Sequence, residues 1–207
     1  MSLYDKYILP KFLNCICSAK PIGYQRQKIV PYAEGAVLEV GIGSGLNLPF
    51  YDKSRVDKIW GLDPSKELNK MASKVASEEG LEVDFLISEA EDIPLPDNEV
   101  DTVLITYTMC TITEVMRANE EMRRVLKPKG TMIFCEHGKS PDQNVFKWQK
   151  RINPLWRKIA GGCNLHRDIP SLIKESGFKL EKLDTMYLPS TPKFAGYNYW
   201  GYAKPII

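Results

Sequence analysis

The sequence predicts an α/β fold, a doubly wound (Rossmann-like) sheet of seven strands in a single domain, with an antiparallel last strand. Five apolar runs alternate with segments of helical periodicity between residues 35 and 177, as in parallel strands joined by helices. The run VLEVGIGSGLNL at 37–48 ends in a glycine-rich turn of the kind that follows a buried strand. Residues 178–207 have the alternating, aromatic character of two antiparallel strands.

Composition indicates an ordinary globular protein. The chain has 207 residues, a formal net charge of +2 and a hydrophobic share of 43%. These values suit one domain and exclude disordered, membrane-spanning and polyanion-binding classes. The five cysteines include no C-x-x-C pair, so we expect free thiols in a reducing cytoplasm. The first residues carry charges and Pro10, so we expect neither a signal peptide nor a spanning helix there.

The glycine-rich turn predicts a ligand-binding loop. Gly41, Gly43 and Gly45 have the spacing G-x-G-x-G, which lacks the third glycine position of the dinucleotide fingerprint, and no P-loop lysine follows. A pyrophosphate ligand is therefore disfavoured. A nucleoside with a small, partly cationic tail remains, because Glu39 at the strand end suits an ammonium group. S-adenosylmethionine matches that description, and an ordinary strand-to-helix turn is the alternative.

Two acidic residues follow the next two apolar runs. Asp63 ends the second strand, 18 positions after Gly45, where a carboxylate accepts hydrogen bonds from a ribose diol. Because Pro64 and Ser65 follow it, a turn or helix-start role is the alternative. Glu89, with Ala90 beside it, follows the third strand and is expected to accept from the adenine amine, unless it belongs to a solvated acidic loop.

A longer apolar run, VDTVLITYTMCTIT, is the natural central strand. Its carboxyl end near Thr106 is expected beside the glycine loop, because ligands of open parallel sheets bind at the carboxyl ends of strands. Thr106 and Asn47, the latter in the loop itself, complete the expected cofactor site. Helices are predicted over 65–77 and 114–126, and the motif LKPKG ends the second of them. The fifth strand, TMIFCEHG, runs out into Glu136 and His137.

The pattern changes after the fifth strand. Residues 141–162 predict a helical insertion broken at Pro154. Asp168 is placed to cap the next helix and Gly177 to end it.

We therefore divide the expected domain into four segments. These are a helical lid (1–34), a cofactor-binding core (35–138), a substrate-side helical segment (139–177) and a terminal β-hairpin (178–207). In the lid, apolar residues from Leu3 to Ile16 approximate helical spacing. A helix that only covers a sheet edge is the alternative for this segment.

The chain resembles a known family at these motifs. With Glu39, the three glycines, Asp63, Glu89 and LKPKG, its first two-thirds resembles class I S-adenosylmethionine-dependent methyltransferases of methyltransferase type 11. The resemblance implies that the glycine loop approaches the methionine part, Asp63 the ribose, and Glu89 with Ala90 the adenine. The usual family residue at the position of Glu89 is an aspartate.

The last third carries a more specific resemblance. The motifs CEHGKSPD, KWQ, NPLW and GGCNLHR are similar to the carboxyl half of the animal methyltransferase-like alkyl thiol methyltransferases and their small bacterial relatives. This implies methyl transfer to a small thiol or sulfide. Phospholipid and quinone methyltransferases share the first two-thirds, so the substrate inference depends on the last third alone.

Two residues are candidates for catalysis. Methyl transfer from a sulfonium is an in-line displacement, and a thiol reacts far better as its thiolate. His137, at the carboxyl end of the fifth strand, is the first candidate for a base or substrate orienter. Arg167 is a candidate for stabilising an anionic nucleophile. The alternatives are a histidine held by structure beside Glu136 and a salt bridge at a helix end.

Further residues are expected to line a substrate pocket, although core packing is an alternative for each aromatic residue and cysteine. They are Tyr107, Cys110, Trp148, Trp156, Cys163 and His166. No metal ligand set is expected, because the two histidines lie far apart and no cysteine or acid spacing matches them. Nucleic-acid methylation is disfavoured, because TYTMCT stands where a base-holding Asn-Pro-Pro run is required and no basic stripe occurs.

The sequence thus predicts a cytoplasmic S-adenosylmethionine-dependent methyltransferase of small-molecule thiols or sulfides, monomeric or homodimeric, without nucleic-acid partners. Phospholipid-headgroup N-methylation and quinone C-methylation are the enzymatic alternatives. The first of these fits weak membrane-surface association through the amino-terminal segment and the Lys and Arg residues of 147–158. A regulatory module that binds S-adenosylmethionine without turnover is the alternative that is not an enzyme.

Overall fold

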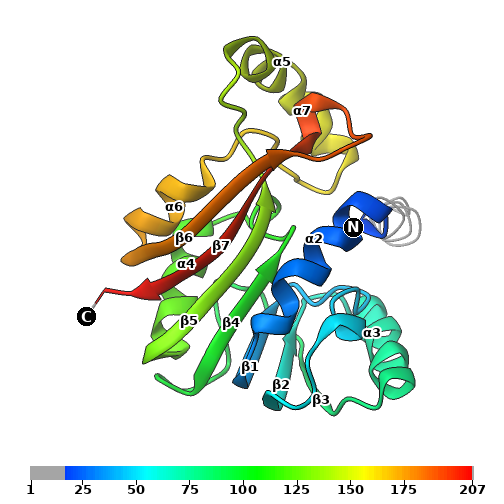
Figure 1. Ribbon diagram of the computed structural model, residues 1–207, viewed down its shortest axis with the longest axis vertical. Helices are drawn as coiled ribbons and strands as arrows, with labels where there is room; N and C mark the ends of the chain where they lie inside the picture. The colour runs from blue at the N-terminus through cyan, green and yellow to red at the C-terminus, as the bar shows by residue number, and fades with distance from the viewer. Residues whose placement is uncertain (1–16, 207) are drawn as a thin grey trace.

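The computed structural model describes residues 17–206. The predicted helical spacing from Leu3 to Ile16 lies outside the described residues. Within them the chain forms one seven-stranded sheet of order β3-β2-β1-β4-β5-β7-β6 (Figure 1). The strands are β1 (Gly35–Val40), β2 (Val56–Leu62), β3 (Val83–Leu86), β4 (Val100–Thr106), β5 (Leu126–His137), β6 (Phe178–Tyr187) and β7 (Tyr197–Pro205).

Strand direction confirms the predicted topology. The first five strands pair in parallel, whereas β7 is antiparallel to both of its neighbours, β5 and β6. A short connection through α7 (Lys193–Gly196) joins β6 to β7, so the carboxyl-terminal hairpin places the reversed strand inside the sheet. The fold is the predicted doubly wound sheet with an antiparallel last strand.

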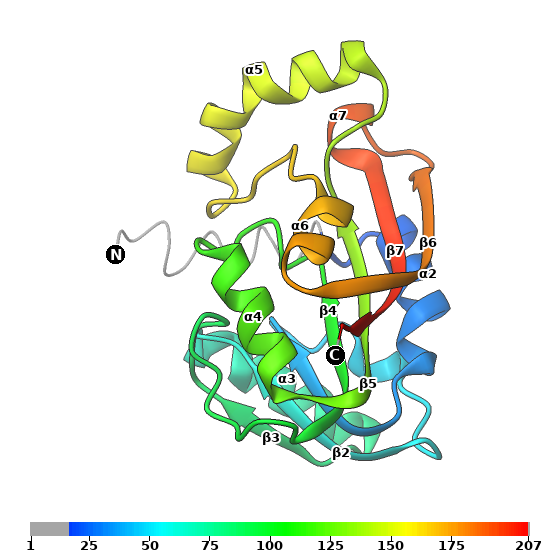
Figure 2. The same ribbon diagram turned by 90° about the vertical axis from the view of Figure 1, so that its left-hand side faces the viewer.

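Helices cover both faces of the sheet (Figure 2). On one face α2 (Lys20–Ile29) and α3 (Lys66–Glu79) pack through Ile29, Ala72 and Ala76. On the other face lie α4 (Val115–Val125) and α6 (Ile169–Glu175). Alternate residues of each central strand enter the two cores, as in a sheet buried on both sides. The helix α5 (Gln143–Ile159) lies beyond the strand ends, near α7.

The predicted cap at Asp168 and helix end at Gly177 are confirmed, and α3 has a similar pair of signals. The Ser65 side chain caps α3 by accepting from the Leu68 backbone N–H, and Gly80 ends that helix with a φ of 62°. The Asp168 carboxylate caps α6 by accepting from Ser171, and Gly177 follows that helix with a φ of 82°. The short 3-10 helices Val30–Tyr32 and Leu48–Phe50 complete the connections around β1.

Two boundaries differ from the prediction. The helix α5 continues through Pro154, which lies on its exposed side. Pro154 has no N–H to donate to the backbone carbonyl of Lys150. Lys150 is exposed, so water reaches this carbonyl and the helix is not broken. The strand β5 begins at Leu126, directly after α4, and includes LKPKG rather than following it. A register shift against β4 near Val100 accommodates this irregular stretch.

Two further properties bear on the chain's class. Among residues 17–206, no helix combines the length and the apolar character that crossing a bilayer requires. The cysteines in this range, Cys17, Cys110, Cys135 and Cys163, are free thiols.

The β6–β7 pairing generates a stability prediction. A Cβ on Gly201 of β7 would lie 2.7 Å from the backbone carbonyl carbon of Lys182 in β6, and backbone cannot move aside as a side chain does. Gly201→Ala should therefore lower the free energy of unfolding by about 1–3 kcal/mol, measured by urea denaturation. Gly23→Ala is the matched control, because a Cβ there meets nothing within 4 Å and alanine favours the helix, adding about 0.5–1 kcal/mol. Equal effects of the two substitutions would contradict this account.

Candidate active site

A cavity of about 470 Å³ opens at the carboxyl ends of the parallel strands. The glycine loop after β1, Asp63 after β2, the segment after β4 and His137 at the end of β5 contribute to its lining. Helix α2, the end of α5 and the connection from β6 to β7 close the remaining sides. The cavity therefore lies where a doubly wound sheet places its ligand.

The glycine loop requires glycine for two different reasons. Gly41 has a φ of 71°, and a Cβ there would overlap the Thr108 side chain. At Gly43, with a φ of 55°, a Cβ would meet only the loop's own Gly41 carbonyl oxygen, 3.9 Å away. The loop backbone thus packs tightly on one side and faces the open cavity on the other.

The Asp63 carboxylate fixes this loop. Its oxygens accept hydrogen bonds from the Gly43 backbone N–H at 3.1 Å and the Ser65 backbone N–H at 2.9 Å. Burial raises the pKa of Asp63, while these two hydrogen bonds lower it. The sequence-predicted acid therefore lines the cavity beside the glycine loop, as the doubly wound fold requires.

A buried polar network lies behind the loop. The Glu39 carboxylate accepts from Asn47 Nδ2 at 2.9 Å and from the Tyr51 hydroxyl at 2.7 Å. Arg26 of α2 donates to Asn47 Oδ1 at 2.7 Å and to Thr106 Oγ1 at 2.6 Å. Burial raises the pKa of Glu39 to about 7, although its hydrogen bonds and the Arg26 charge oppose this. The network ties α2, β1, β4 and the glycine loop together.

The segment after β4 is fixed by hydrogen bonds to two charged side chains, Glu136 and Arg167. Tyr107 has a φ of 54°, a left-handed backbone that a non-glycine residue adopts at a cost. The backbone N–H groups of Thr108 and Met109 donate to Glu136 Oε1 at 2.8 and 3.0 Å. Arg167 donates to the backbone carbonyls of Met109 and Ile112. These contacts fix the position of Cys110 at the cavity wall.

A cysteine–histidine cluster stands at this wall. One ligand atom from each of Cys110, His137 and Cys163 lies within 4.8 Å of the others, and Cys163 Sγ is 3.3 Å from His137 Nε2. All three residues line the cavity. Cys163 reaches it because Gly161 and Gly162, with φ of 59° and 85°, turn the chain sharply after α5.

The cluster's protonation equilibria are mutually dependent. Two contacts lower the pKa of Cys163: the hydrogen bond between its thiol and that of Cys110, and the neighbouring imidazole of His137. The same hydrogen bond raises the pKa of Cys110, and so does burial. Burial lowers the pKa of His137, but the Cys163 sulfur outweighs it and the net pKa is raised. Burial raises the pKa of the adjacent Glu136 to about 7. The imidazole is therefore more basic than a free one.

The structure brings half of the sequence-predicted site residues to the lining of this cavity. Those that line it are Gly41, Gly43, Asp63, Thr106, Tyr107, Cys110, His137, Trp156 and Cys163. Glu39 and Asn47 lie behind the lining in the network described above, and Gly45 packs against Leu48 and Ala72.

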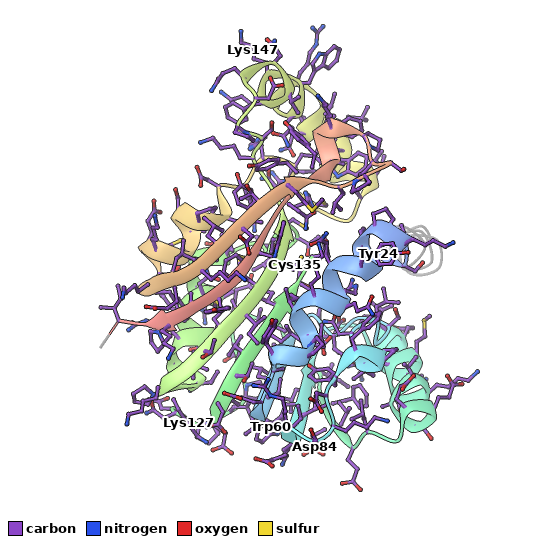
Figure 3. The ribbon with its side chains drawn as sticks, in the orientation of Figure 1. Tyr24, Trp60, Asp84, Lys127, Cys135 and Lys147 are labelled. Carbon is purple, nitrogen blue, oxygen red and sulfur yellow. The ribbon has the colours of Figure 1, made fainter. Side chains whose placement is uncertain are left out.

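Some predicted pocket residues lie elsewhere, which corrects those predictions. Trp148 is 59% exposed on the outer part of α5, next to Lys147, which Figure 3 labels at the far end of the molecule from Lys127. His166 packs edge-to-face on Phe146, with ring centroids 6.2 Å apart. Helical phase explains Trp148, because Gln149 and Asn153, not Trp148, form the buried side of α5.

The role of Arg167 also needs correction, whereas the adenine contact of Glu89 with Ala90 stays a prediction. Glu89 is exposed, Ala90 is buried in the core and Pro64 is exposed, and none of them lines the cavity. Burial is the largest cause of the raised pKa of Glu89, and the carboxylates of Glu91 and Asp63 raise it further. Arg167 does not line the cavity either, and binds backbone carbonyls rather than facing a nucleophile.

Sequence reasoning missed several residues of the site. Arg26 and Cys17 line the cavity from the segment before β1, and Asn198 lines it from β7, where its amide donates to the Tyr107 hydroxyl at 2.9 Å. No metal ligand set was expected from the spacing in the chain, and the fold brings one ligand atom each of Cys110, His137 and Cys163 within 4.8 Å of one another. An arginine on the apolar phase of α2 was the one available signal for Arg26.

Comparison with known proteins agrees with this geometry. A family model of the methyltransferase domain matches residues 38–134. Rat thiol S-methyltransferase TMT1B is 30% identical over 79% of this chain and 70% of its own length. Phosphatidylethanolamine N-methyltransferase of Cereibacter sphaeroides is 34% identical over 50% of this chain and 51% of its own. A SAM-dependent methyltransferase structure from Aquifex aeolicus, 21% identical, superimposes with a TM-score of 0.67 over 95% of this chain and 98% of its own.

The fold and the site define a class I S-adenosylmethionine-dependent methyltransferase. The chain belongs to the methyltransferase type 11 family and is an enzyme that uses S-adenosylmethionine. The cavity fits this methyl donor: Gly43 leaves its backbone open to the cavity, and Asp63 lies beside it. Arg26 also lines the cavity, and its Nε is buried without a hydrogen-bond partner among residues 17–206.

The Glu39 pKa generates a prediction about pH. The folded protein holds the Glu39 proton up to about pH 7, whereas the unfolded chain releases it near its ordinary value of 4.5. Between these values the unfolded state binds fewer protons, so rising pH removes stability from the wild type. Glu39→Gln cannot ionise, so the wild-type free energy of unfolding minus that of the variant should fall by about 3 kcal/mol across this range. Urea denaturation at several pH values measures it, and a difference independent of pH would contradict the assignment. The pKa of Glu136 is also raised to about 7, but Glu136 is present in both proteins, so its contribution cancels in this difference.

Proposed function

We propose that this enzyme transfers the methyl group of S-adenosylmethionine to the sulfur of a small thiol or sulfide in the cytoplasm. One observation carries the proposal: a single cavity joins the glycine loop with Asp63 to the cluster of Cys110, His137 and Cys163. The wall between them is apolar and aromatic, with Tyr107 and Trp156 among its residues. Such a wall suits a small apolar acceptor.

The donor half of the proposal assigns three roles. The Asp63 carboxylate uses its remaining lone pairs to accept hydrogen bonds from the ribose hydroxyls. The loop from Gly41 to Gly45 approaches the methionine part, where a side chain would obstruct it. Arg26, a buried cation at the cavity wall, binds the donor's carboxylate.

The acceptor half assigns the proton. Bound S-adenosylmethionine supplies an electrophilic methyl group on its sulfonium. The acceptor thiol must lose its proton to become a good nucleophile, and His137 is placed to take it. Cys163 supports this role by position, because its Sγ lies 3.3 Å from His137 Nε2 and helps fix the ring at the cavity wall. The cavity wall orients the acceptor and excludes water, and the products are a thioether and S-adenosylhomocysteine.

The comparisons support sulfur as the acceptor atom. Similarity to the rat thiol S-methyltransferase extends over 79% of the chain, which is more than the cofactor-binding core. Similarity to the bacterial phosphatidylethanolamine N-methyltransferase covers only half of it. Since the acceptor wall is built partly from residues after 134, the longer match is the more informative one.

One surface favours a second candidate, N-methylation of a phospholipid headgroup. Helix α5 exposes Trp148, Leu155 and Ile159 by 59%, 66% and 44%, and basic residues surround them. Such a face suits contact with an anionic membrane surface. Sedimentation with anionic vesicles at low salt, together with an assay on phosphatidylethanolamine, distinguishes this candidate from a thiol enzyme that stays in the supernatant.

The ribose assignment predicts a loss of donor affinity. Asp63→Asn removes a charge-assisted hydrogen bond of about 1.5–3 kcal/mol, so the Kd for S-adenosylhomocysteine should rise about 10- to 100-fold in calorimetry. Asp84→Asn is the matched control, because Asp84 is exposed on β3, where Figure 3 labels it, and pairs with Lys58. Unchanged affinity in Asp63→Asn would refute the assignment.

The acceptor assignment predicts a loss of turnover that depends on pH. His137→Ala should lower kcat/KM for alkyl thiols about 10²-fold or more at pH 7, with S-adenosylhomocysteine affinity nearly unchanged. The deficit should shrink above about pH 8.5, where the thiol ionises unaided. His166→Ala is the matched control. A full rate at pH 7 would remove His137 from the mechanism; mass spectrometry of methylated products reports the rate.

A further inference from the structure

The cluster at the acceptor end of the cavity combines two sulfur atoms and an imidazole from three separate parts of the chain. Cys110 follows β4, His137 ends β5 and Cys163 follows α5. Cys110 and Cys163 are 3% and 8% exposed. Core packing alone does not require a histidine beside two cysteines, and all three residues line the cavity.

The spacing of these atoms suits a tetrahedral ion. With Zn–S near 2.3 Å and Zn–N near 2.0–2.1 Å, tetrahedral ligands stand about 3.5 Å apart for S and N and about 3.8 Å for two S atoms. The Cys163 Sγ to His137 Nε2 distance is 3.3 Å, and one ligand atom from each of the three residues falls within 4.8 Å of the others. With 4.8 Å as the upper bound on the other distances, shifts of about 1 Å or less would complete the geometry.

The surroundings hold these residues in place. Glu136 Oε1 binds the Thr108 and Met109 backbone N–H groups, and Arg167 binds carbonyls of the same segment. The Asn164 backbone N–H donates to the Cys110 carbonyl at 2.9 Å, which ties the two cysteine-bearing loops together. A preorganised set of soft ligands is what a thiophilic divalent cation requires.

We propose that Cys110, Cys163 and His137 bind one Zn²⁺ ion whose fourth coordination position faces the cavity. Thiolates with imidazole favour zinc over magnesium or calcium, which prefer oxygen ligands. Three protein ligands with an open position are typical of catalytic zinc sites, whereas structural sites use four. The cavity-facing position is open to a small molecule because all three residues line the same cavity.

The open position has a use that rests on the proposed thiol methylation. The acceptor thiol binds the ion through sulfur and releases its proton to solvent, so it is a thiolate at neutral pH. That sulfur forms a bond to the methyl carbon as the bond from this carbon to the donor sulfur breaks. The thioether product is a weaker ligand than a thiolate and dissociates. In the loaded enzyme His137 is a ligand, and its proton-accepting role belongs to the metal-free protein.

Cobalt spectroscopy tests the metal site without any turnover. Metal-free protein, reduced and treated with a chelator, is titrated with Co²⁺. We expect one equivalent to bind, with thiolate-to-cobalt charge-transfer absorption and visible bands of tetrahedral cobalt, and Zn²⁺ to displace it. Cys110→Ser, Cys163→Ser and His137→Ala should each weaken Co²⁺ binding by about 100-fold or more. Their far-ultraviolet circular dichroism shows whether they are folded.

Matched variants separate this site from other thiols and imidazoles. Cys135→Ser and His166→Ala should retain the cobalt spectrum, because neither residue lines the cavity or belongs to the cluster. If wild-type protein takes up no Co²⁺ or Zn²⁺, or if the folded double variant Cys110→Ser/Cys163→Ser keeps the spectrum, the site is refuted. A Cys110–Cys163 disulfide in protein purified without reductant and without metal, with no metal uptake after reduction, also refutes it.

Adding an alkyl thiol to the cobalt-loaded protein tests the open position. We expect the charge-transfer absorption to increase as a further sulfur binds, in the absence of S-adenosylmethionine. An unchanged spectrum, with full thiol methylation by chelator-treated enzyme, refutes activation by the metal but leaves the proposed function standing. A changed spectrum with no methylation of any thiol supports the site and refutes the proposed function instead.

Discussion

The buried hydrogen bonds around Asn47 are the interaction on which the cavity depends. The Asn47 side chain hydrogen-bonds with both Glu39 of β1 and Arg26 of α2, and it also donates to Thr106 at the end of β4. Because these groups are buried, each bond left unmade would cost the desolvation of its partner, which makes the arrangement nearly all-or-none. The glycine loop thus owes its position to charge and hydrogen bonding as much as to its own backbone freedom.

The cavity divides the work of the chain between two kinds of structure. The donor end uses features that any doubly wound sheet supplies, which are strand ends, a tight loop and an acid after the second strand. The acceptor end is built from connecting segments, the loop after β4 and the turn after α5. Their positions are fixed by Glu136 and Arg167, whose bonds go to backbone and therefore do not depend on neighbouring side chains.

The sequence pattern predicted those features of the fold and site that depend on residues close together in the chain. The doubly wound topology, the cap at Asp168 and the places of Asp63 and His137 follow from periodicity and from the rule that ligands bind at strand ends. The approach of Cys163 to His137 did not, because it depends on the course of α5 and on two left-handed glycines that follow it. Trp148 was misplaced for a related reason: a helix phase one residue different would have turned it inward.

The reversed strand β7 has a consequence for biosynthesis. It lies between β5 and β6 although it is synthesised after both, so β5 exposes an unpaired edge until residues 197–205 have left the ribosome. The same strand brings Asn198 to the hydroxyl of Tyr107 at the cavity wall. A nascent chain that stops short of β7 therefore has a complete glycine loop but an open acceptor wall, and methyl transfer must await the insertion of this strand into the sheet.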